Sequence, residues 1–439
     1  MRTEAQAKRL FFRRIPLDCF GQFLGPDLLA AVRRYDDPRR RCRQMGLQGF
    51  LWLGLLVAAY TALPSLEAIF WRVGPMLASG AVLGCRLVSV SAFTQFRGRF
   101  PLRVLMRVWH LLADQARRSL DESRATWRGL RLWAGDGTGL CLPEELWVAF
   151  GAHKGCRGDG PAQGHLVVLY DLAARVPVRL RLAPYQTKER ALAVRLLNHL
   201  GAGDLVMLDG GFYSIGLFAQ LQRQGAHWLV PMRANGTPRR LRYLGPGDGL
   251  YEIRASQSYW KDVPEVPKTM VVRIITVHRR GFRPRRLVTD LVDAKAFPAN
   301  ELAEVYHQRW HIETFYRELK HTLKVQHWHA RTLRGVYAEL FFTMILACLT
   351  RLAMIEAAAK DGSVGPLSFG RCLQWVNIAL AATATTAADQ WALLYEDLLT
   401  RIRRCRIDVR PERNFERDRQ KRRKTSRAKR LAASQEGQP

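Results

Sequence analysis

Two aspartates stand at positions that suggest the end of a buried strand. Asp136 follows the apolar run 130–134, Asp209 follows Leu205–Leu208, and a glycine comes directly after each acid. Glycine lets the backbone turn sharply, and in open α/β sheets ligands bind at the carboxyl edge of the strands. An Asp-Gly pair is also typical of an ordinary turn. The pattern therefore predicts two carboxylates on neighbouring strand ends, with a purely structural turn as the alternative for each.

A third carboxylate lies in a helical pattern from about Asn300 to Lys324. Four polar residues fall at steps of three, four and seven, so at about 100° per residue they lie within about 60° of one another. They are Tyr306, Arg309, Glu313 and Lys320. Apolar residues form a separate stripe, which is expected to pack against the sheet. A solvated face with pairing between Glu313 and its basic neighbours is the simpler alternative.

Three carboxylates beside basic groups suit phosphodiester chemistry. Carboxylate oxygens are ligands that Mg²⁺ prefers, with Mn²⁺ able to take its place. Two ions held by Asp136, Asp209 and Glu313 would activate an attacking water or 3′-hydroxyl and stabilise the leaving oxygen. Basic side chains beside them would hold the neighbouring phosphates in line.

Composition points to the same class of partner. The 439 residues carry 69 Lys plus Arg against 38 Asp plus Glu, a formal charge of +31, and 48% are apolar, so a folded basic protein with a polyanionic partner is expected. Near the C-terminus the contiguous residues Lys421, Arg422, Arg423 and Lys424 are typical of a nucleic-acid-binding arm. Eight scattered cysteines, no secretory leader pattern and no apolar run long enough to span a bilayer predict a cytoplasmic protein without a membrane partner.

The chain is patterned as helices, then alternating strands and helices, then helices again. Apolar spacing predicts helices in the first 127 residues, including 28–34, 48–63, 66–73 and 102–120. A hairpin is expected from 165–172 and 176–182, a helix from Thr187 as N-cap to Leu200, and then a strand, a helix over 214–224 and a strand over 227–231. Turn signals and a β-branched run at Met270–Val277 predict a β-rich insertion with a basic face after Arg233.

These motifs resemble those of the insertion-sequence-4 family of bacterial DDE transposases. Tyr306-x2-Arg309-x3-Glu313-x6-Lys320 matches the family's Y-R-E-K signature without a gap. Asp136-Gly137-Thr138 resembles its first acidic motif, and Asp209-Gly210-Gly211-Phe212-Tyr213 its second, usually D-R-G-F-Y. The resemblance covers about residues 86 to 330, and the long interval between Asp209 and Glu313 fits the family's β-rich insertion.

The resemblance implies an α/β fold: a ribonuclease-H-like core interrupted by a β-rich insertion and flanked by helical regions. Asp136, Asp209 and Glu313 would be catalytic and hold two Mg²⁺ ions, while Tyr306, Arg309 and Lys320 would bind DNA phosphates. The expected segments are an N-terminal helical DNA-binding region (1–127), the first part of the core (128–232), the insertion (233–297), the catalytic helix (298–330), a C-terminal helical region (331–410) and a basic tail (411–439).

The implied activity is metal-dependent cleavage at the terminal inverted repeats of an insertion sequence, followed by transfer of the 3′-hydroxyl to target DNA. A homodimer on DNA, associated with the bacterial nucleoid, would pair the two ends. Two alternatives are a nuclease without strand transfer and a catalytically inactive DNA-binding regulator. Gly210 departs from the family pattern, where arginine is usual, and Trp260 is a candidate for the aromatic wedge of a hairpin step, with packing as its alternative role.

Overall fold

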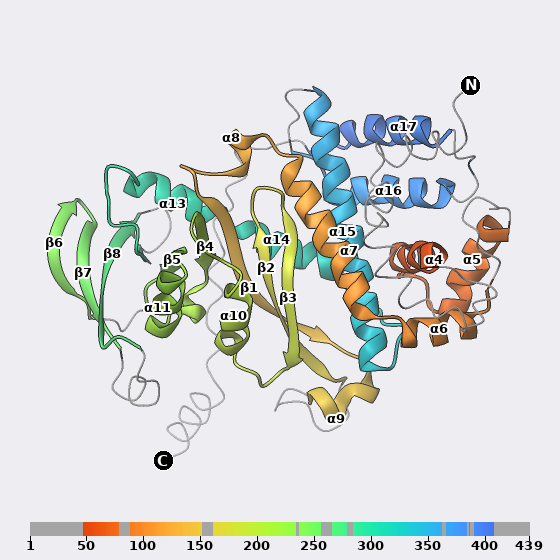
Figure 1. The fold of residues 1–439 in the computed structure, drawn as a ribbon, viewed down its shortest axis with the longest axis horizontal. Coiled ribbons are helices and arrows are strands. Elements are labelled where there is room, and N and C mark those ends of the chain that lie inside the picture. The colour runs from red at the N-terminus through yellow and green to blue at the C-terminus, as the bar shows by residue number, and fades with distance from the viewer. Residues whose placement is uncertain are drawn as a thin grey trace, which may run out of the picture.

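A nine-stranded sheet forms the centre of the fold, with strand order β3-β2-β1-β4-β5-β9-β8-β7-β6 (Figure 1). The computed structural model describes residues 47–78, 88–151, 161–233, 237–255, 266–278, 284–361, 366–383, 386 and 390–407. Nothing in the predicted helix 28–34, at Trp260 or in the basic tail falls within these ranges. The class is mixed α/β, as the alternation of sequence patterns predicts.

Five strands form the part of the sheet in which the two acidic motifs lie. They are β1 (Arg131–Cys141), β2 (Gln163–Asp171), β3 (Val176–Pro184), β4 (Asp204–Leu208) and β5 (His227–Pro231). The predicted hairpin is confirmed, because β2 pairs antiparallel with β3. β1 pairs antiparallel with β2 and parallel with β4, and β4 pairs parallel with β5. The two strands that bear or precede the aspartates are therefore direct neighbours in the middle of the sheet.

The β-rich segment extends the same sheet. Its strands are β6 (Arg239–Gly245), β7 (Asp248–Arg254), β8 (Thr269–Val277) and β9 (Arg285–Thr289). They pair antiparallel in succession, and β9 joins them to the core by pairing with β5. Arg273 is fully buried here and makes a bidentate ion pair with Asp248, with Nη2 at 2.6 Å from Oδ2 and Nε at 2.8 Å from Oδ1. This arginine therefore belongs to the interior and not to the predicted basic face.

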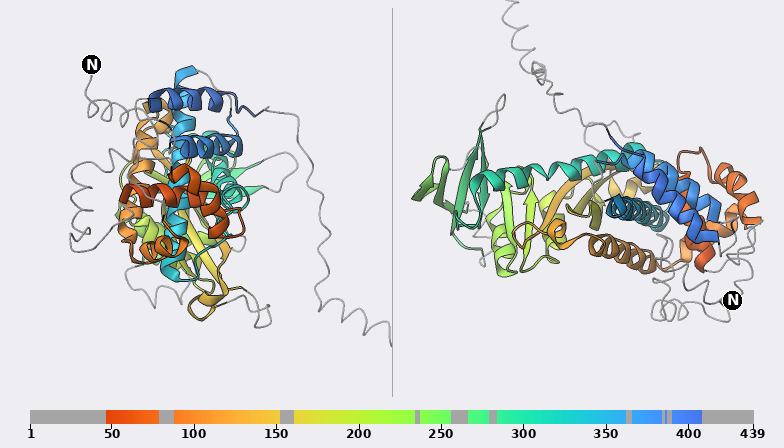
Figure 2. Two further views of the ribbon diagram at one scale, coloured as in Figure 1. Left: turned by 90° about the vertical axis from the view of Figure 1, so that its right-hand side faces the viewer. Right: turned by 90° about the horizontal axis from the view of Figure 1, so that it is seen from above.

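Helices cover both faces of the core strands. α10 (Glu189–Leu197) and α11 (Ile215–Arg223) lie on one face, and α13 (Ala299–His307) and α14 (Trp310–Arg317) on the other (Figure 2, right). Short elements connect them: α8 (Glu122–Ala125), η2 (Glu144–Leu146), α9 (Trp147–Phe150), η3 (Gly210–Phe212) and the π-helical turn η4 (Glu318–Thr322). Lys188, not the predicted Thr187, is the N-cap of α10.

Helices from both ends of the chain pack together beside the sheet. They are α4 (Leu47–Ala59), α5 (Leu66–Ala78), α6 (Val90–Arg99), α7 (Leu102–Arg118), α15 (Leu333–Asp361), α16 (Phe369–Thr383) and α17 (Trp391–Arg403). α15 packs along α7 and also touches α4 and α17 (Figure 1). By length and composition, residues 333–360 could span a bilayer, but 89% of the apolar stretch is buried inside the protein, as in a core helix.

The long helix predicted from Asn300 to Lys324 is not continuous. α13 ends at His307, and the junction to α14 is tightened by hydrogen bonds from Arg309 N to Tyr306 O and from Ile312 N to Arg309 O. These i→i−3 bonds are of the 3₁₀ type. After α14 the chain widens into η4, closed by Leu323 N donating to Glu318 O. The prediction of one regular helix from Asn300 to Lys324 is therefore wrong. The angles calculated between its side chains do not apply, because the winding changes at the α13–α14 junction and again at η4.

Candidate active site

Asp136 and Asp209 occupy matching positions on adjacent strands. The parallel pairing of β1 with β4 aligns Gly135 with Leu208, the last residue of β4. The residue that follows each of these two is an aspartate, Asp136 or Asp209. The sequence placed Asp136 at a strand end, which is wrong: β1 continues to Cys141, because β2 keeps pairing with it through Gln163 after β4 has stopped. The register still puts the two acids at matching positions, because each directly follows one residue of the pair Gly135 and Leu208.

Asp136 is largely enclosed, with 17% of its side chain exposed. Its Oδ1 accepts a hydrogen bond of 2.9 Å from the Gly137 amide. Burial raises the pKa of Asp136 to about 6, and the charges of Asp209 and Glu189 add to the increase, while the Gly137 amide and Arg309 oppose it. This carboxylate is therefore short of positive charge, since its neighbours do not fully compensate its ionised form.

Asp209 is exposed and leads into η3. Among the described residues, no hydrogen bond or ion pair engages its carboxylate, and its main-chain oxygen accepts from the Phe212 amide at 3.0 Å. Within the described residues, the Asp209 carboxylate thus has no partner at the end of β4, and its charge is near enough to act on Asp136.

The Tyr306 and Arg309 side chains connect the helical motif to both aspartate motifs. The Tyr306 hydroxyl donates to the carbonyl oxygen of Leu208 at 3.2 Å, which ties α13 to the residue before Asp209. Arg309 places Nη1 3.7 Å from Asp136 Oδ2 and Nη2 2.6 Å from Glu313 Oε1. One guanidinium therefore bridges two of the three predicted catalytic acids.

Lys320 contacts the first acidic motif from η4. Its Nζ donates to Thr138 Oγ1 at 2.7 Å, and burial lowers the pKa of the ammonium. Tyr316, which lies outside the four-residue signature, donates its hydroxyl to the carbonyl oxygen of Asp136. Its position one helical turn after Glu313 was the available signal. All four signature residues are thus linked to the two aspartate motifs or to each other, although Tyr306 and Arg309 are buried and not presented to solvent.

The donor set can be tested against the divalent ions that the family pattern implies. In the part of the chain that the structure describes, no three His, Cys, Asp or Glu side chains lie close enough to hold a metal ion. The acids at this edge offer only carboxylate oxygens, which are the ligands of Mg²⁺ and Mn²⁺. Arg309 supplies positive charge between Asp136 and Glu313, and its buried Nε has no hydrogen-bond partner among the described residues. The type of ligand therefore suits these ions, whereas the described side chains of Asp136, Asp209 and Glu313 do not lie close enough together in this structure to share one.

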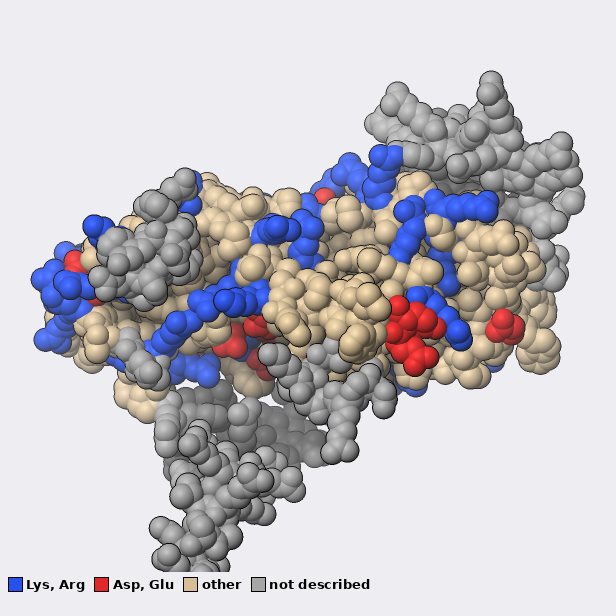
Figure 3. Space-filling model, turned by 90° about the horizontal axis from the view of Figure 1, so that it is seen from below, with Lys and Arg blue, Asp and Glu red and all other residues tan. Residues whose placement is uncertain are grey.

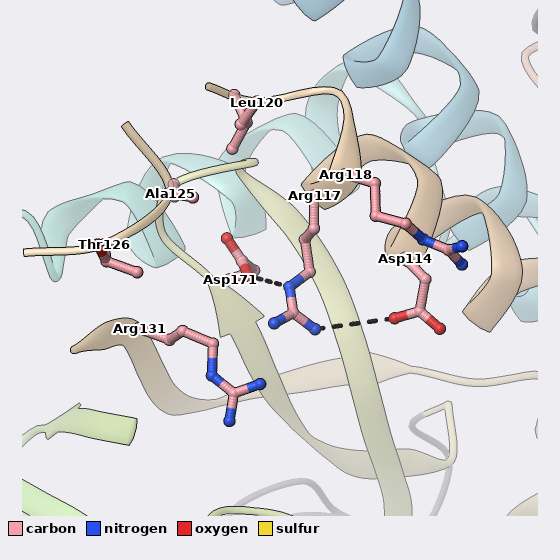
Figure 4. Close-up of a pocket in the computed structure, with 9 residues that line it drawn as sticks. Asp114, Arg117, Arg118, Leu120, Ala125, Thr126, Arg131 and Asp171 are labelled. Carbon is pink, nitrogen blue, oxygen red and sulfur yellow. Dashed lines mark ion pairs between the residues drawn. The ribbon is translucent and has the colours of Figure 1, made fainter. Parts of the chain in front are cut away.

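Two cavities lined by described residues lie away from these acids. One cavity of about 310 Å³ lies near the opposite end of β1 and is lined by Arg117, Arg131 and Asp171 (Figure 4). Its charges are compensated internally, since Arg117 Nε lies 2.9 Å from Asp171 and Arg131 Nε 2.8 Å from Asp204. A second cavity, of about 600 Å³, lies beside Cys141 and Trp328. The ion pair between Arg117 and Asp171 beside the first cavity joins α7 to the sheet, so we interpret the charges there as a structural network.

Position 210 does not require glycine for steric reasons. A Cβ built on it would lie 3.6 Å from Pro231 Cβ, an ordinary contact, and its φ is not positive. The backbone at this position therefore leaves room for the Cβ of the arginine that is usual in the family pattern.

Comparison with known proteins agrees with the chemistry of these residues. Residues 127–349 match the family model of the transposase DDE domain. The chain is 27% identical over 414 residues to the transposase InsG for insertion sequence element IS4 of Escherichia coli (strain K12), covering 92% of each chain. A cryo-EM structure of the piggyBac transposase synaptic complex with hairpin DNA is similar at a TM-score of 0.45 and 11% identity, over 90% of this chain and 86% of that one. The chain belongs to the family of DDE transposases, as its resemblance to the insertion-sequence-4 members predicts.

Proposed function

We propose that this DNA transposase cleaves the strands at the terminal inverted repeats of its own element and joins the resulting 3′-hydroxyl to target DNA. The observation that supports the proposal is the pairing of Gly135 with Leu208, the residues directly before Asp136 and Asp209, together with the contacts of Arg309 with Glu313 and Asp136. Asp136, Asp209 and Glu313 would hold two Mg²⁺ ions, or Mn²⁺ in their place. Such ions lower the pKa of a bound hydroxyl and neutralise charge on a phosphate.

The chain's own residues position the DNA. Lys320 is the group best placed to meet a phosphate, because it is half-buried and held by Thr138 on the strand that carries Asp136. Arg309 keeps the Asp136 and Glu313 carboxylates oriented toward one another. Tyr306 fixes the helix to the end of β4 through Leu208. Positioning and charge neutralisation of this kind supply most of the catalysis in phosphoryl transfer.

Strands β3-β2-β1-β4-β5 would form the ribonuclease-H-like core. The other regions would be the N-terminal helical region (1–127), the β-rich insertion (233–297), the catalytic helix (298–330), the C-terminal helical region (331–410) and the basic tail (411–439). The β-rich segment would hold DNA through exposed arginines on β6 and β9: Arg239, Arg240, Arg242, Arg285 and Arg286. Basic side chains gather at the β6–β8 end of the molecule and continue toward acidic side chains near the middle of the face (Figure 3). A homodimer on DNA in the bacterial cytoplasm would pair the two element ends.

The test compares wild type with Glu313→Gln on duplex DNA ending in the element's inverted repeat. The substitution keeps the shape and a hydrogen-bond acceptor for Arg309 but removes the negative charge that cations need, so cleavage should fall by about 10²-fold or more while end binding persists. Glu304→Gln, an exposed position on α13, is the control and should cleave normally.

The same assay separates the alternatives. A nuclease would cleave the end but leave its 3′-hydroxyl unjoined to a second DNA. An inactive regulator would bind the end without cleavage in Mg²⁺ or Mn²⁺. Near-normal cleavage by Glu313→Gln would contradict the assignment of Glu313 as a catalytic acid.

A further inference from the structure

Basic side chains gather over the edge strand β3 and the two helices that pack on it. β3 is the first strand in the order of the sheet, and both α7 and α10 contact it (Figure 1). We define the β3 patch as five residues from these elements: Arg107 and His110 of α7, Arg179 and Arg181 of β3, and His199, two residues after α10. Arg107, Arg181 and His199 are exposed, and Arg179 is half-buried.

The members of the β3 patch are close enough for their charges to act on one another. Burial lowers the pKa of His110 to about 3. The charges of Arg179, His199 and Arg107 add to this decrease. Burial also lowers the pKa of His199, with further contributions from Arg179 and Arg181. Three elements that are distant in the sequence therefore bring positive groups to one surface.

The arginines of the β3 patch are not neutralised by acidic partners. None of Arg107, Arg179 and Arg181 forms an ion pair within the described part of the chain. The charge of Asp114 acts on Arg179, but the Asp114 carboxylate lies 3.7 Å from a guanidinium nitrogen of Arg117. A surface that collects one sign of charge attracts a partner of the opposite sign. The β3 patch therefore has the electrostatic character of a site for a polyanion.

The β3 patch lies on the face of the sheet away from the Asp136 side chain. Asp136 pairs with Val168 of β2, and Val168 pairs with Leu180 of β3. Paired residues share a face of the sheet, and successive residues of a strand alternate between the faces. Arg179 and Arg181 stand on either side of Leu180, so they belong to the opposite face. Phosphates bound by the patch would therefore be separated from Asp136 by the sheet.

The composition and position of the β3 patch suit phosphate contacts and not base contacts. The planar fork of arginine matches the oxygens of a phosphate. An edge strand between two helices offers no projecting helix or ribbon that could enter the major groove. Phosphate contacts carry no direct sequence information. This kind of surface therefore suits DNA of arbitrary sequence, as a target duplex is, better than an element end that must be recognised.

We propose that the β3 patch binds the backbone phosphates of the target duplex beside the point of joining. The inference rests on the proposed function, because a target duplex is needed only if the protein joins DNA ends. The cleaved element end occupies the acids of β1, β4 and α14, and the β3 patch holds the second duplex against the opposite face.

The experiment uses the full chain with Arg179 and Arg181 both replaced by glutamine. Binding to an unrelated duplex is measured across a salt series, and the log-affinity against log-salt slope should be shallower by about two units, because two phosphate contacts are lost. Joining of a short precut element end to that duplex, supplied below saturation, should fall by about tenfold or more. Cleavage of the short, uncut element end should stay within about twofold of wild type, since neither arginine lies at the acids.

The matched control replaces Arg371 and Arg404 by glutamine. These exposed residues on α16 and at the end of α17 remove the same charge from another surface, and all three measurements should stay near wild type. Thermal unfolding reports whether each variant folds. If the β3 double variant does not fold, Arg107→Gln on the surface of α7 takes its place, with an expected change in slope of about one unit.

Three results would overturn the inference. The first is a slope and a joining rate that match those of the control variant. The second is a shallower slope with unchanged joining, which would mean that the patch binds DNA other than the target. The third is an equal loss of cleavage and joining, which would assign the patch to the element end. If wild type joins no ends at all, the proposed strand transfer is wrong, and the inference falls with it.

Discussion

Arg309 joins Asp136 to Glu313 through the two ends of one guanidinium, 3.7 Å from the first carboxylate and 2.6 Å from the second. Only 6% of the residue is exposed. Although burial opposes it, the oxygens of Tyr306, Glu313 and Asp136 raise the pKa of Arg309, so it stays charged. The bridge thus orients two acids from different elements by a single internal cation.

Arg309→Lys should uncouple these acids. A lysine keeps the charge, but one ammonium cannot span two carboxylates as a planar fork does. We expect single-turnover cleavage at saturating enzyme to fall by about 10²-fold, the cost of a displacement of about 1 Å in a site, with a much smaller change in DNA affinity. Arg317→Lys, exposed on the same helix, is the control. Equal loss of affinity with unchanged turnover would show that Arg309 serves binding and not alignment.

Glu356 should make the stability of the protein depend on pH. Its carboxylate on α15 accepts a hydrogen bond from the Tyr395 hydroxyl on α17, and burial raises its pKa from 4.5 to about 7. The folded state therefore holds the proton more tightly than the unfolded state. The stabilisation is fully present below pH 4.5 and is lost as the pH rises toward 7.

Glu356→Gln cannot ionise, so it should remove this loss. We expect the free energy of unfolding to exceed that of wild type by about 1–3 kcal/mol at pH 8 and to match it near pH 4. Chemical denaturation across this pH series measures the difference, with Glu304→Gln as an exposed control. A constant difference between wild type and Glu356→Gln at every pH would contradict the shifted pKa.

Local patterns predicted most elements of the core but not their extent. The β2–β3 hairpin follows from two β-rich runs joined by a short link, and the strand before Asp209 follows from the short, fully apolar run 205–208. Asp-Gly at 136 has the same local pattern whether the strand stops or continues. What decides is the pairing of β1 with β2, whose partners Gly137 and Val167 are remote in the sequence.

In the site, too, the local sequence predicted which residues matter but not the conformation of the chain that carries them. Residue spacing predicted that Tyr306, Arg309, Glu313 and Lys320 share one helix face. In the structure they lie on differently wound segments, where Tyr306 contacts Leu208, Arg309 contacts Glu313 and Lys320 contacts Thr138. No proline or glycine marks the tightened junction at Arg309 or the π-helical turn after it, so the change in winding depends on tertiary contacts.

Gly54 should be intolerant of any side chain. A Cβ there would lie 2.1 Å from Cζ of Phe342, a buried ring on α15, so α4 can pack only with glycine at this point. Gly54→Ala should destabilise the fold by about 1–3 kcal/mol through overpacking. Gly98→Ala is the matched comparison, since nothing lies within 4 Å of its Cβ on helix α6. It should gain about 0.5–1 kcal/mol from reduced backbone entropy. Effects of the same sign in urea denaturation would contradict this packing.

Gly210→Arg tests the one departure from the family's second acidic motif. The backbone accepts a side chain here, because the nearest atoms to a Cβ belong to Pro231 at 3.6 and 3.8 Å, so the melting temperature should stay near that of wild type. The added arginine would stand one residue after Asp209, whose carboxylate has no partner within the described residues, and would offer a guanidinium to a phosphate. We expect faster single-turnover cleavage than wild type, and a log-affinity against log-salt slope steeper by about one unit. Gly210→Ala adds bulk without charge and should change neither quantity. If Gly210→Arg matches Gly210→Ala in both, the missing arginine does not weaken this enzyme, and the residues around Asp136 and Glu313 suffice without it.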